Sequence, residues 1–313
     1  MKYCSICILF ALSSTLLPAQ SIKKIAITID DLPVNSTDAS DVRWRYVTNS
    51  ILGALKKYNV PAIGFVNEGK LSVNGQVSVN RAKLLDQWYE QGLELGNHTW
   101  SHLEYNTHSI DEYEADIIKG SQYIDKLYRD APERIRYFRH PYLHTGDTRE
   151  KKDALTAVLI KHNYVVAPVT VDNSDWIFAR AYDIALDKKD SGMQERLREE
   201  YVPYMVAKVK YFESQARDLF GRDISHILLM HANSINAACL GSLLQALQQE
   251  GFSFASLTEV LQDPAFKTED DFIGRAGISW VHRWAITQKK PKTFFGNEPR
   301  VPDHIQKYSG LEE

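Results

Sequence analysis

The chain has 313 residues, of which 44% are hydrophobic and 25% charged, with 16 glycines and 11 prolines. This composition excludes a disordered, collagen-like or coiled-coil protein, and the length predicts one large domain or two ordinary ones. The 37 basic and 40 acidic residues give a formal net charge of -3. Because no global basic field attracts polyanions, we expect no nucleic-acid partner.

The first 20 residues have the pattern of a secretory signal peptide. Lys2 precedes an apolar run over residues 6–17, and a small-residue exit follows at 18–20. The run is shorter than the roughly 20 apolar residues that a membrane span needs. We therefore expect cleavage near residue 20 and an exported protein, periplasmic or extracellular, with no membrane span in its mature part. The alternative is an uncleaved anchor.

Cysteine usage agrees with this expectation. Cys4 and Cys7 are spaced like a metal or redox pair, but both lie in the expected leader. Cleavage would leave Cys239 as the one cysteine, so no intrachain disulfide is expected. We interpret Cys239 as a small core residue rather than a nucleophile, since nothing basic neighbours it in sequence.

The remaining chain alternates predicted strands with predicted helices. The predicted strands cover residues 23–31, 61–67, 93–95, 135–139, 164–172, 224–231 and 252–255. The predicted helices start near Ser40, with an apolar stripe of Val42, Val47, Ile51 and Leu55, and then cover 81–91, 111–129, 149–162, 196–220 and a last stretch through 249. This alternation predicts parallel βαβ units, arranged as a barrel or as a doubly wound sheet.

Polar side chains gather at the carboxyl ends of these strands. They are Asp30 and Asp31, His98, Arg139, Asp172 with Asp175, and His231. In an α/β barrel this face carries the active site, because the loops after the strands meet there. The placement therefore predicts a catalytic cluster before any motif is considered.

His98 and His102 are four residues apart, so one helical turn would aim both imidazoles at one metal ion. Asp30 and Asp31 add an oxygen ligand and a second carboxylate; alone, that pair would be read as a helix cap or turn. Two histidines and one carboxylate leave open positions on Zn²⁺, as in catalytic sites. The second carboxylate then suits a general base, and His231 suits the general acid.

Five short segments carry a family resemblance. In chain order they are Thr28-Ile29-Asp30-Asp31-Leu32-Pro33, His98-Thr99-Trp100-Ser101-His102, Arg139-His140-Pro141-Tyr142, Asp172-Asn173-Ser174-Asp175-Trp176 and Leu229-Met230-His231. Their order and composition resemble the motifs of polysaccharide deacetylases of the NodB-homology type, carbohydrate esterase family 4. The resemblance implies an irregular (β/α) barrel of about seven parallel strands.

The resemblance implies a metal centre with Asp31, His98 and His102 as ligands. Zn²⁺ is the expected ion, with Co²⁺, Ni²⁺ and Mn²⁺ as alternatives. Asp30 resembles the base that activates the attacking water. Arg139 would orient Asp30 and lower its pKa through an opposite-charge pairing.

The resemblance also implies the remaining machinery. The backbone N–H of Tyr142 would stabilise the oxyanion, and His231 would be the general acid, oriented by Asp175. Trp176 and Leu229 would line the pocket for the acetyl methyl group. The expected substrate partner is an acetylated glycan or oligosaccharide.

Departures from the family pattern lie at Leu32, where the family has glycine, and at His140, Leu143 and His144. They predict altered substrate specificity, with a bulkier first loop at Leu32. His144, like His108, is expected to be a solvated surface histidine.

Three parts are expected: a leader over 1–20, a catalytic domain over 21–263 and a C-terminal extension over 264–313 packed on the barrel. The extension is rich in aromatics, among them Trp280 and Trp284, for which a sugar-stacking platform is the alternative. The stretch 177–204 is longer than a barrel connection needs and is interpreted as a lid or a surface elaboration.

The functional expectation is a metal-dependent hydrolase that removes acetyl groups from N-acetylated amino sugars. The alternatives are an O-acetyl esterase on acetylated xylan, a hydrolase of non-glycan amides or imides, and a non-catalytic carbohydrate-binding relative. The oligomeric state does not follow from the sequence.

Overall fold

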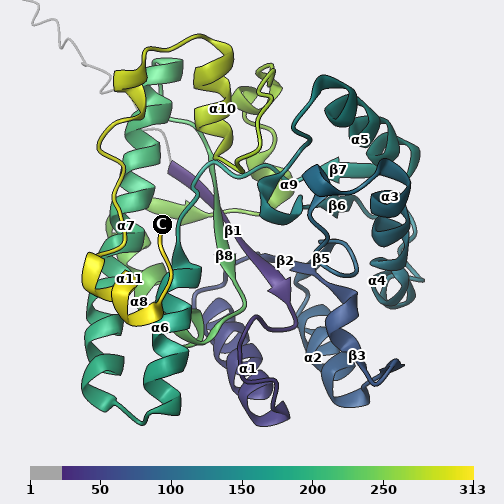
Figure 1. The fold of residues 1–313 in the computed structure, drawn as a ribbon, viewed down its shortest axis with the longest axis vertical. Coiled ribbons are helices and arrows are strands. Elements are labelled where there is room, and N and C mark those ends of the chain that lie inside the picture. The colour runs from purple at the N-terminus through teal and green to yellow at the C-terminus, as the bar shows by residue number, and fades with distance from the viewer. Residues whose placement is uncertain (1–22) are drawn as a thin grey trace, which may run out of the picture.

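The computed structural model describes residues 23–313, so the expected signal peptide lies outside the described residues. Seven strands form one parallel sheet in the order β7-β6-β5-β2-β1-β8, with β9 beside the start of β1 (Figure 1). The strands are β1 (Lys23–Leu32), β2 (Ile63–Val66), β5 (Glu94–Asn97), β6 (Arg136–Phe138), β7 (Tyr164–Val166), β8 (His226–His231) and β9 (Phe252–Phe254). The expected irregular barrel of about seven parallel strands is confirmed.

The barrel is irregular because the strand expected over 164–172 is divided. Only β7 pairs with β6, and Pro168 follows it. The chain then crosses to β8, where Val171 N–H donates to the Ile227 carbonyl (3.0 Å) and Leu229 N–H donates to the Val171 carbonyl (3.1 Å). This crossing segment joins the two outer edges of the curled sheet.

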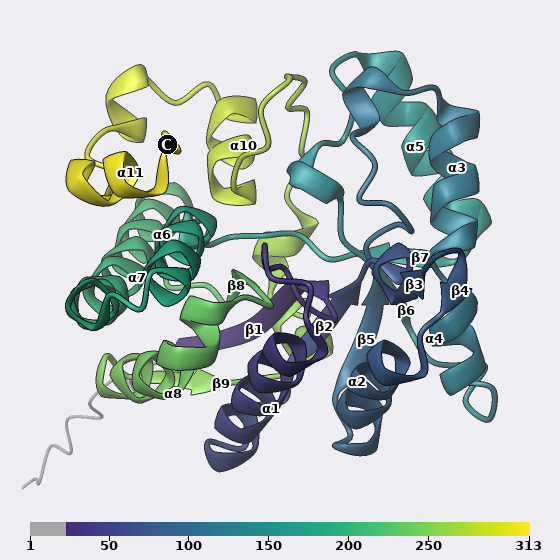
Figure 2. The same cartoon turned by 60° about the horizontal axis from the view of Figure 1, so that its bottom comes forward.

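Helices surround the curled sheet (Figures 1 and 2). They are α1 (Asp41–Lys57), α2 (Val79–Glu90), α3 (Ile110–Lys119), α4 (Gln122–Leu127), α5 (Arg149–Lys161), α6 (Asp175–Asp187), α7 (Ser191–Phe220), α8 (Ser234–Gln249), α9 (Leu257–Val260), α10 (Trp280–Thr287) and α11 (Asp303–Ser309). No helix of residues 23–313 is long and apolar enough to cross a membrane.

Two helical expectations were wrong in detail. The helix expected over 111–129 is divided into α3 and α4 at Gly120, where a Cβ would stand 2.5 Å from the carbonyl carbon of Thr99. On α1, Val47 and its apolar partners are buried, but Val42 is 70% exposed because a spacing of five residues from Val47 places it away from the buried face of the helix. A short hairpin that the sequence analysis missed, β3 (Ser72–Val73) and β4 (Gln76–Val77), precedes α2.

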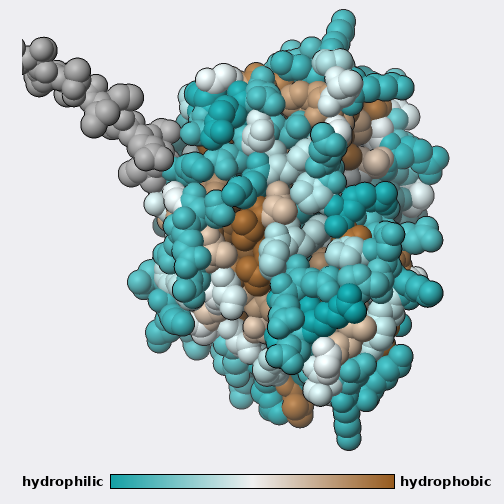
Figure 3. All heavy atoms as spheres, turned by 90° about the vertical axis from the view of Figure 1, so that its left-hand side faces the viewer, coloured by the Kyte–Doolittle hydropathy of each residue, from teal (hydrophilic) through white to brown (hydrophobic). Residues whose placement is uncertain are grey.

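The C-terminal segment packs beside α7 (Figure 2). Trp280 and Trp284 are 7% and 1% exposed and belong to the main core, so they pack and do not offer a sugar platform. Cys239 is also buried, as expected. The face on which α7 and α11 lie is mostly hydrophilic, with a small hydrophobic patch near its middle (Figure 3).

Candidate active site

Asp30 and Asp31 reach one pocket because β1 is irregular at its end. In a regular strand, consecutive side chains point to opposite faces. The pairing of β1 with β2 shifts register between Ile29 and Leu32, and Asp31 has a φ of 70°. This irregularity lets both carboxylates line the same cavity.

His98 and His102 lie in a loop, and not in the helical turn that their spacing suggested. The loop follows β5 and turns through left-handed residues, with φ values of 62° at Thr99 and 58° at His102. The side-chain oxygen of Asn97 accepts the Thr99 N–H at 2.7 Å and stabilises the turn. The two imidazole rings end 4.8 Å apart, so the loop brings them together as the helix would have done.

Asp31, His98 and His102 offer one ligand atom each within 4.8 Å of one another. Asp31 Oδ1 is buried without a hydrogen-bond partner and lies 3.7 Å from His102 Nε2 and 4.0 Å from His98 Nε2. His98 Nδ1 lies 2.8 Å from the Arg139 carbonyl, and an N–H donated there leaves Nε2 available as a ligand. Burial lowers the pKa of both histidines and favours the neutral form that metals need. This donor set fits a divalent cation.

Two residues that the sequence analysis missed contact Asp31. Lys70 Nζ lies 3.0 Å from the Asp31 carbonyl oxygen and 3.3 Å from Oδ1, and Asn35 Nδ2 donates to Oδ2 at 2.7 Å. Burial opposes ionisation of Asp31, but Lys70 and His102 outweigh it and hold its pKa well below the usual range. Lys70 follows β2 in the sequence and approaches Asp31 only in the folded chain, so no local sequence pattern predicts this contact.

Asp30 is held by a buried arginine, as the resemblance implied. Arg139 is fully buried, and its Nη1 lies 3.4 Å from Asp30 Oδ2 while Nη2 donates to Thr28 Oγ1 at 3.0 Å. Burial raises the pKa of Asp30 to about 6, although Arg139 acts in the lowering direction. Asp30 Oδ1 is buried with no hydrogen-bond partner, so this oxygen is available to accept a proton.

His231 is paired with a fully buried carboxylate. Its Nδ1 lies 2.6 Å from Asp175 Oδ1, and its backbone N–H donates to Asp175 Oδ2 at 2.9 Å. Asn236, which the sequence analysis missed, donates to the same Oδ2 at 2.7 Å. Burial lowers the pKa of His231, but the Asp175 charge and hydrogen bond outweigh it and raise the pKa to about 9. The pairing with Asp175 therefore favours the protonated imidazole.

The loop that carries Tyr142 has a strained backbone, and residues of the C-terminal segment hold it in place. Tyr142 and Leu143 both have a φ of 55°. The fully buried Arg283 of α10 donates to the Leu143 carbonyl and to Thr145 Oγ1. Gly277 lies so close that a Cβ there would stand 1.7 Å from the Tyr142 carbonyl oxygen. Within residues 23–313 the Tyr142 N–H has no acceptor, which suits an oxyanion donor.

The predicted residues surround one cavity of about 710 Å³. Its lining includes Asp30, Asp31, His98, His102, Tyr142, Trp176, Leu229 and His231, together with Asp172 and Asn173. Arg139 and Asp175 lie behind this lining, where they contact Asp30 and His231. Tyr142 and Trp176 are 54% and 39% exposed, so they are accessible to a substrate.

Two departures from the family pattern are placed differently than expected. Leu32 is fully buried and packs toward Gly64, where a Cβ would stand 2.1 Å from Leu32 Cδ1, so it does not enlarge the substrate loop. His144 lines the cavity and pairs with Glu104 at 2.7 Å, so it is not a solvated surface histidine. His108 lies outside the cavity lining.

Comparison with known proteins also indicates polysaccharide deacetylases. The family model described as polysaccharide deacetylase matches residues 18–159. A peptidoglycan-N-acetylglucosamine deacetylase of Bacillus cereus is 29% identical over 153 residues, which are 49% of this chain and 46% of that protein. A peptidoglycan-N-acetylglucosamine deacetylase of Listeria monocytogenes is 31% identical over 243 residues, which are 77% of this chain and 40% of that protein. The chain thus spans less than half of the length of these curated relatives.

Solved structures share the fold. A mutant of a carbohydrate esterase family 4 pseudoenzyme matches with a TM-score of 0.52 and 19% identity, covering 77% of this chain and 68% of that one. The wild-type pseudoenzyme, from Bacillus anthracis, matches with a TM-score of 0.50 and 19% identity, covering 77% of this chain and 66% of that one. Identities this low support the fold alone.

Proposed function

Because the chain belongs to the polysaccharide deacetylase family, we propose that it hydrolyses the N-acetyl groups of amino sugars in a glycan. The observation that carries the proposal is the pairing of a base and an acid across the candidate metal site. Asp30 and His231 are register partners on β1 and β8, and each is held by a buried residue of opposite charge. A non-catalytic binding protein would not need two such pairs.

Asp31, His98 and His102 would hold the cation, with Zn²⁺ as the proposed ion and Co²⁺, Ni²⁺ or Mn²⁺ as alternatives. When bound, such a cation supplies Lewis-acid polarisation of the scissile carbonyl and lowers the pKa of water. The three residues leave coordination positions open for this chemistry.

The chain's own groups would then complete the hydrolysis. Asp30 Oδ1 takes a proton from the attacking water, and the Tyr142 N–H donates to the developing oxyanion. The protonated His231 gives its proton to the leaving nitrogen, while Asp175 keeps the ring oriented. Acetate and a free amine are the products.

We further propose N-acetylglucosamine units as the substrate, since the relatives from Bacillus cereus and Listeria monocytogenes are named for that sugar. The leader expected over residues 1–20 supports an activity outside the cytoplasm. The exposed rings of Tyr142 and Trp176 suit the apolar faces of a sugar chain.

The test is acetate release by the purified, metal-loaded protein from chitooligosaccharides, peptidoglycan and acetyl-xylan side by side. Release from an amino sugar that stops on chelation is the expected result, and Asp30→Asn should abolish it while metal stays bound. Release from acetyl-xylan alone would indicate that the enzyme hydrolyses O-acetyl esters and not N-acetyl amides. Metal-bound protein that releases no acetate from any of the three would contradict the proposal.

A further inference from the structure

The histidine that departs from the family pattern at position 144 pairs with a glutamate of the candidate metal-binding loop. His144 Nδ1 lies 2.7 Å from Glu104 Oε1, and the two side chains are only 17% and 26% exposed. Glu104 follows the candidate ligand His102 by two residues, and His144 follows the proposed oxyanion donor Tyr142 by two residues. The pair therefore joins the loop that would hold the cation to the loop that would bind the oxyanion.

This contact is the direct polar link between the two loops. Within the part of the chain that the structure describes, it is the only hydrogen bond between residues 102–104 and residues 141–144. The Tyr142 ring also packs between the loops, with centroid distances of 4.4 Å to the His102 ring and 5.6 Å to the His144 ring. Ring packing is less directional than a hydrogen bond, so the hydrogen bond is what fixes one loop relative to the other.

Both loops have a backbone conformation that needs support from their surroundings. His102 and Tyr142 have φ values of 58° and 55°, in the left-handed region that residues other than glycine rarely adopt. Such residues keep this conformation only where the surrounding structure fixes it. Glu104 is itself fixed, because its Oε1 also accepts the Asn106 N–H at 2.9 Å and caps the helical turn that follows. The pair extends this support to the second loop.

We propose that Glu104 and His144 are positioning residues, whose hydrogen bond sets the distance between the oxyanion donor and the cation site. The inference rests on the proposed function, in which the Tyr142 N–H and the cation act on the same carbonyl group. Such a donor is effective only within about 2.7–3.1 Å of the oxygen on which charge develops. The bond does not need a charged imidazole, because Nδ1–H donates to the carboxylate in the neutral form as well.

The experiment is a double-mutant cycle of Glu104→Ala and His144→Phe, with acetate release from chitotetraose as the first readout. Each single change should lower kcat about tenfold and leave KM unchanged, because one hydrogen bond is lost while the substrate contacts remain. The double variant should be no slower than either single variant, since both changes remove the same bond. Glu104→Gln, which keeps an oxygen that accepts from Nδ1, should retain kcat within about twofold.

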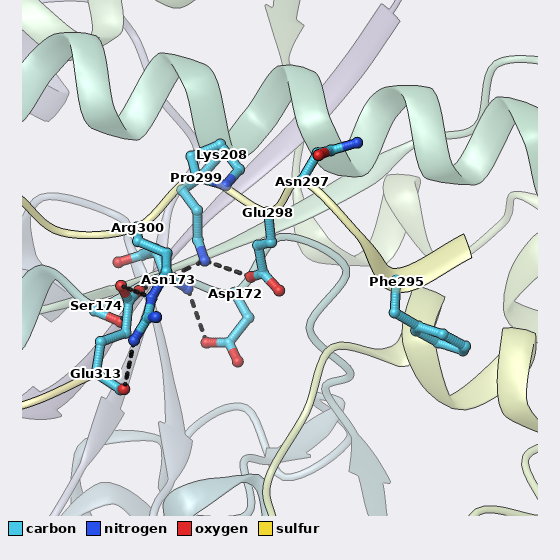
Figure 4. Close-up of a pocket in the computed structure, with 10 residues that line it drawn as sticks. All are labelled: Asp172, Asn173, Ser174, Lys208, Phe295, Asn297, Glu298, Pro299, Arg300 and Glu313. Carbon is cyan, nitrogen blue, oxygen red and sulfur yellow. Dashed lines mark hydrogen bonds and ion pairs between the residues drawn. The ribbon is translucent and has the colours of Figure 1, made fainter. Parts of the chain in front are cut away.

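The control is Glu298→Ala, which removes one partner of another ion pair close to the site. Glu298 accepts a hydrogen bond from Lys208 of α7, and both side chains line a second cavity, of about 450 Å³, that shares Asp172 and Asn173 with the catalytic one (Figure 4). Lys208 is 3% exposed, so the loss of its partner should destabilise the protein. The Glu298–Lys208 hydrogen bond involves neither of the two loops, so kcat should stay unchanged.

Amide hydrogen exchange of the full chain is the second readout, and it needs no turnover. The N–H groups of Leu143 and His144 donate to carbonyls within their own loop at 3.0 Å, so they report on the stability of that loop. Glu104→Ala should accelerate their exchange about tenfold, although the change lies on the other loop. Glu298→Ala should leave their exchange unchanged.

Unchanged kcat in Glu104→Ala would overturn the inference, as would additive losses in the double variant. A rise of KM in His144→Phe alone would overturn it as well, because His144 would then be a substrate contact. If the wild-type protein releases no acetate, the proposed function fails, and the exchange measurement then judges the pair separately. Equal exchange rates in wild type and Glu104→Ala would contradict a link between the loops.

Discussion

Replacing Gly277 with alanine tests whether the C-terminal segment positions the oxyanion donor. The alanine Cβ would stand 1.7 Å from the Tyr142 carbonyl oxygen, and contacts below 3.0 Å are essentially never seen. The two backbones must therefore separate by about 1.3 Å, the difference between these two distances. Because Arg283 holds the neighbouring Leu143 carbonyl, the loop cannot move away without losing that contact as well.

A displacement of about 1 Å at a catalytic group is expected to cost about 100-fold in rate, which corresponds to about 2.7 kcal/mol of transition-state stabilisation. The Tyr142 N–H acts on charge that develops during the reaction, so kcat should fall while KM for chitotetraose changes little. The assay is steady-state acetate release, with near-ultraviolet circular dichroism to show that the fold is retained.

Gly53→Ala is the matched control. Gly53 lies on α1 with no neighbouring atom within 4 Å of the added Cβ, so the change should leave kcat unchanged. It should also stabilise the protein by about 0.5–1 kcal/mol, because glycine is unfavourable in a helix interior. A Gly277→Ala protein with unchanged kcat would refute the positioning argument, and a rise in KM alone would show that the loop serves substrate binding.

Further outcomes follow from the other contacts. Lys70→Met, which removes the ammonium group, should tighten zinc binding about tenfold, because a cation 3.3 Å from Asp31 Oδ1 competes with the metal for that oxygen. Titration against a chromophoric chelator measures the zinc affinity, and a weaker affinity in the variant would contradict the reasoning. His102→Ala should lower the zinc content measured by elemental analysis, and undiminished content would remove His102 from the ligand set. The pH profile of kcat/KM should rise as Asp30 loses its proton and fall as His231 loses its proton. A bound cation lowers the pKa of both groups, so the two limbs should lie at or below about pH 6 and about pH 9. A profile that stays level to pH 10 would exclude His231 as the acid.

Most of the elements, and the place of the site, could be predicted from the sequence. Strands with alternating β-branched residues and amphipathic helices are local patterns, and the residues that end each strand are set by chain position alone. The sequence therefore predicts that Asp30, His98 and His231 lie together, because the carboxyl ends of parallel strands meet at one face, and all three line the same cavity.

The local geometry of the site depends on contacts between residues that are far apart in the sequence. The irregular end of β1 that turns Asp31 into the pocket depends on pairing with β2, and the loop of His98 replaces an expected helical turn. Gly120 lies where the predicted helix divides, and the backbone of Thr99 leaves no room for a Cβ there. Each of these features depends on a backbone group from elsewhere in the fold.

The sequence by itself determined which chemical groups this protein can bring to a substrate: carboxylates, imidazoles and an arginine at strand ends. Only the tertiary structure decided that Lys70 contacts Asp31, that Gly277 presses on the Tyr142 loop and that Lys208 faces a second cavity. The physical reason is that periodicity and strand-end position are encoded in neighbouring residues. Close packing between distant segments depends on the shape of the whole chain.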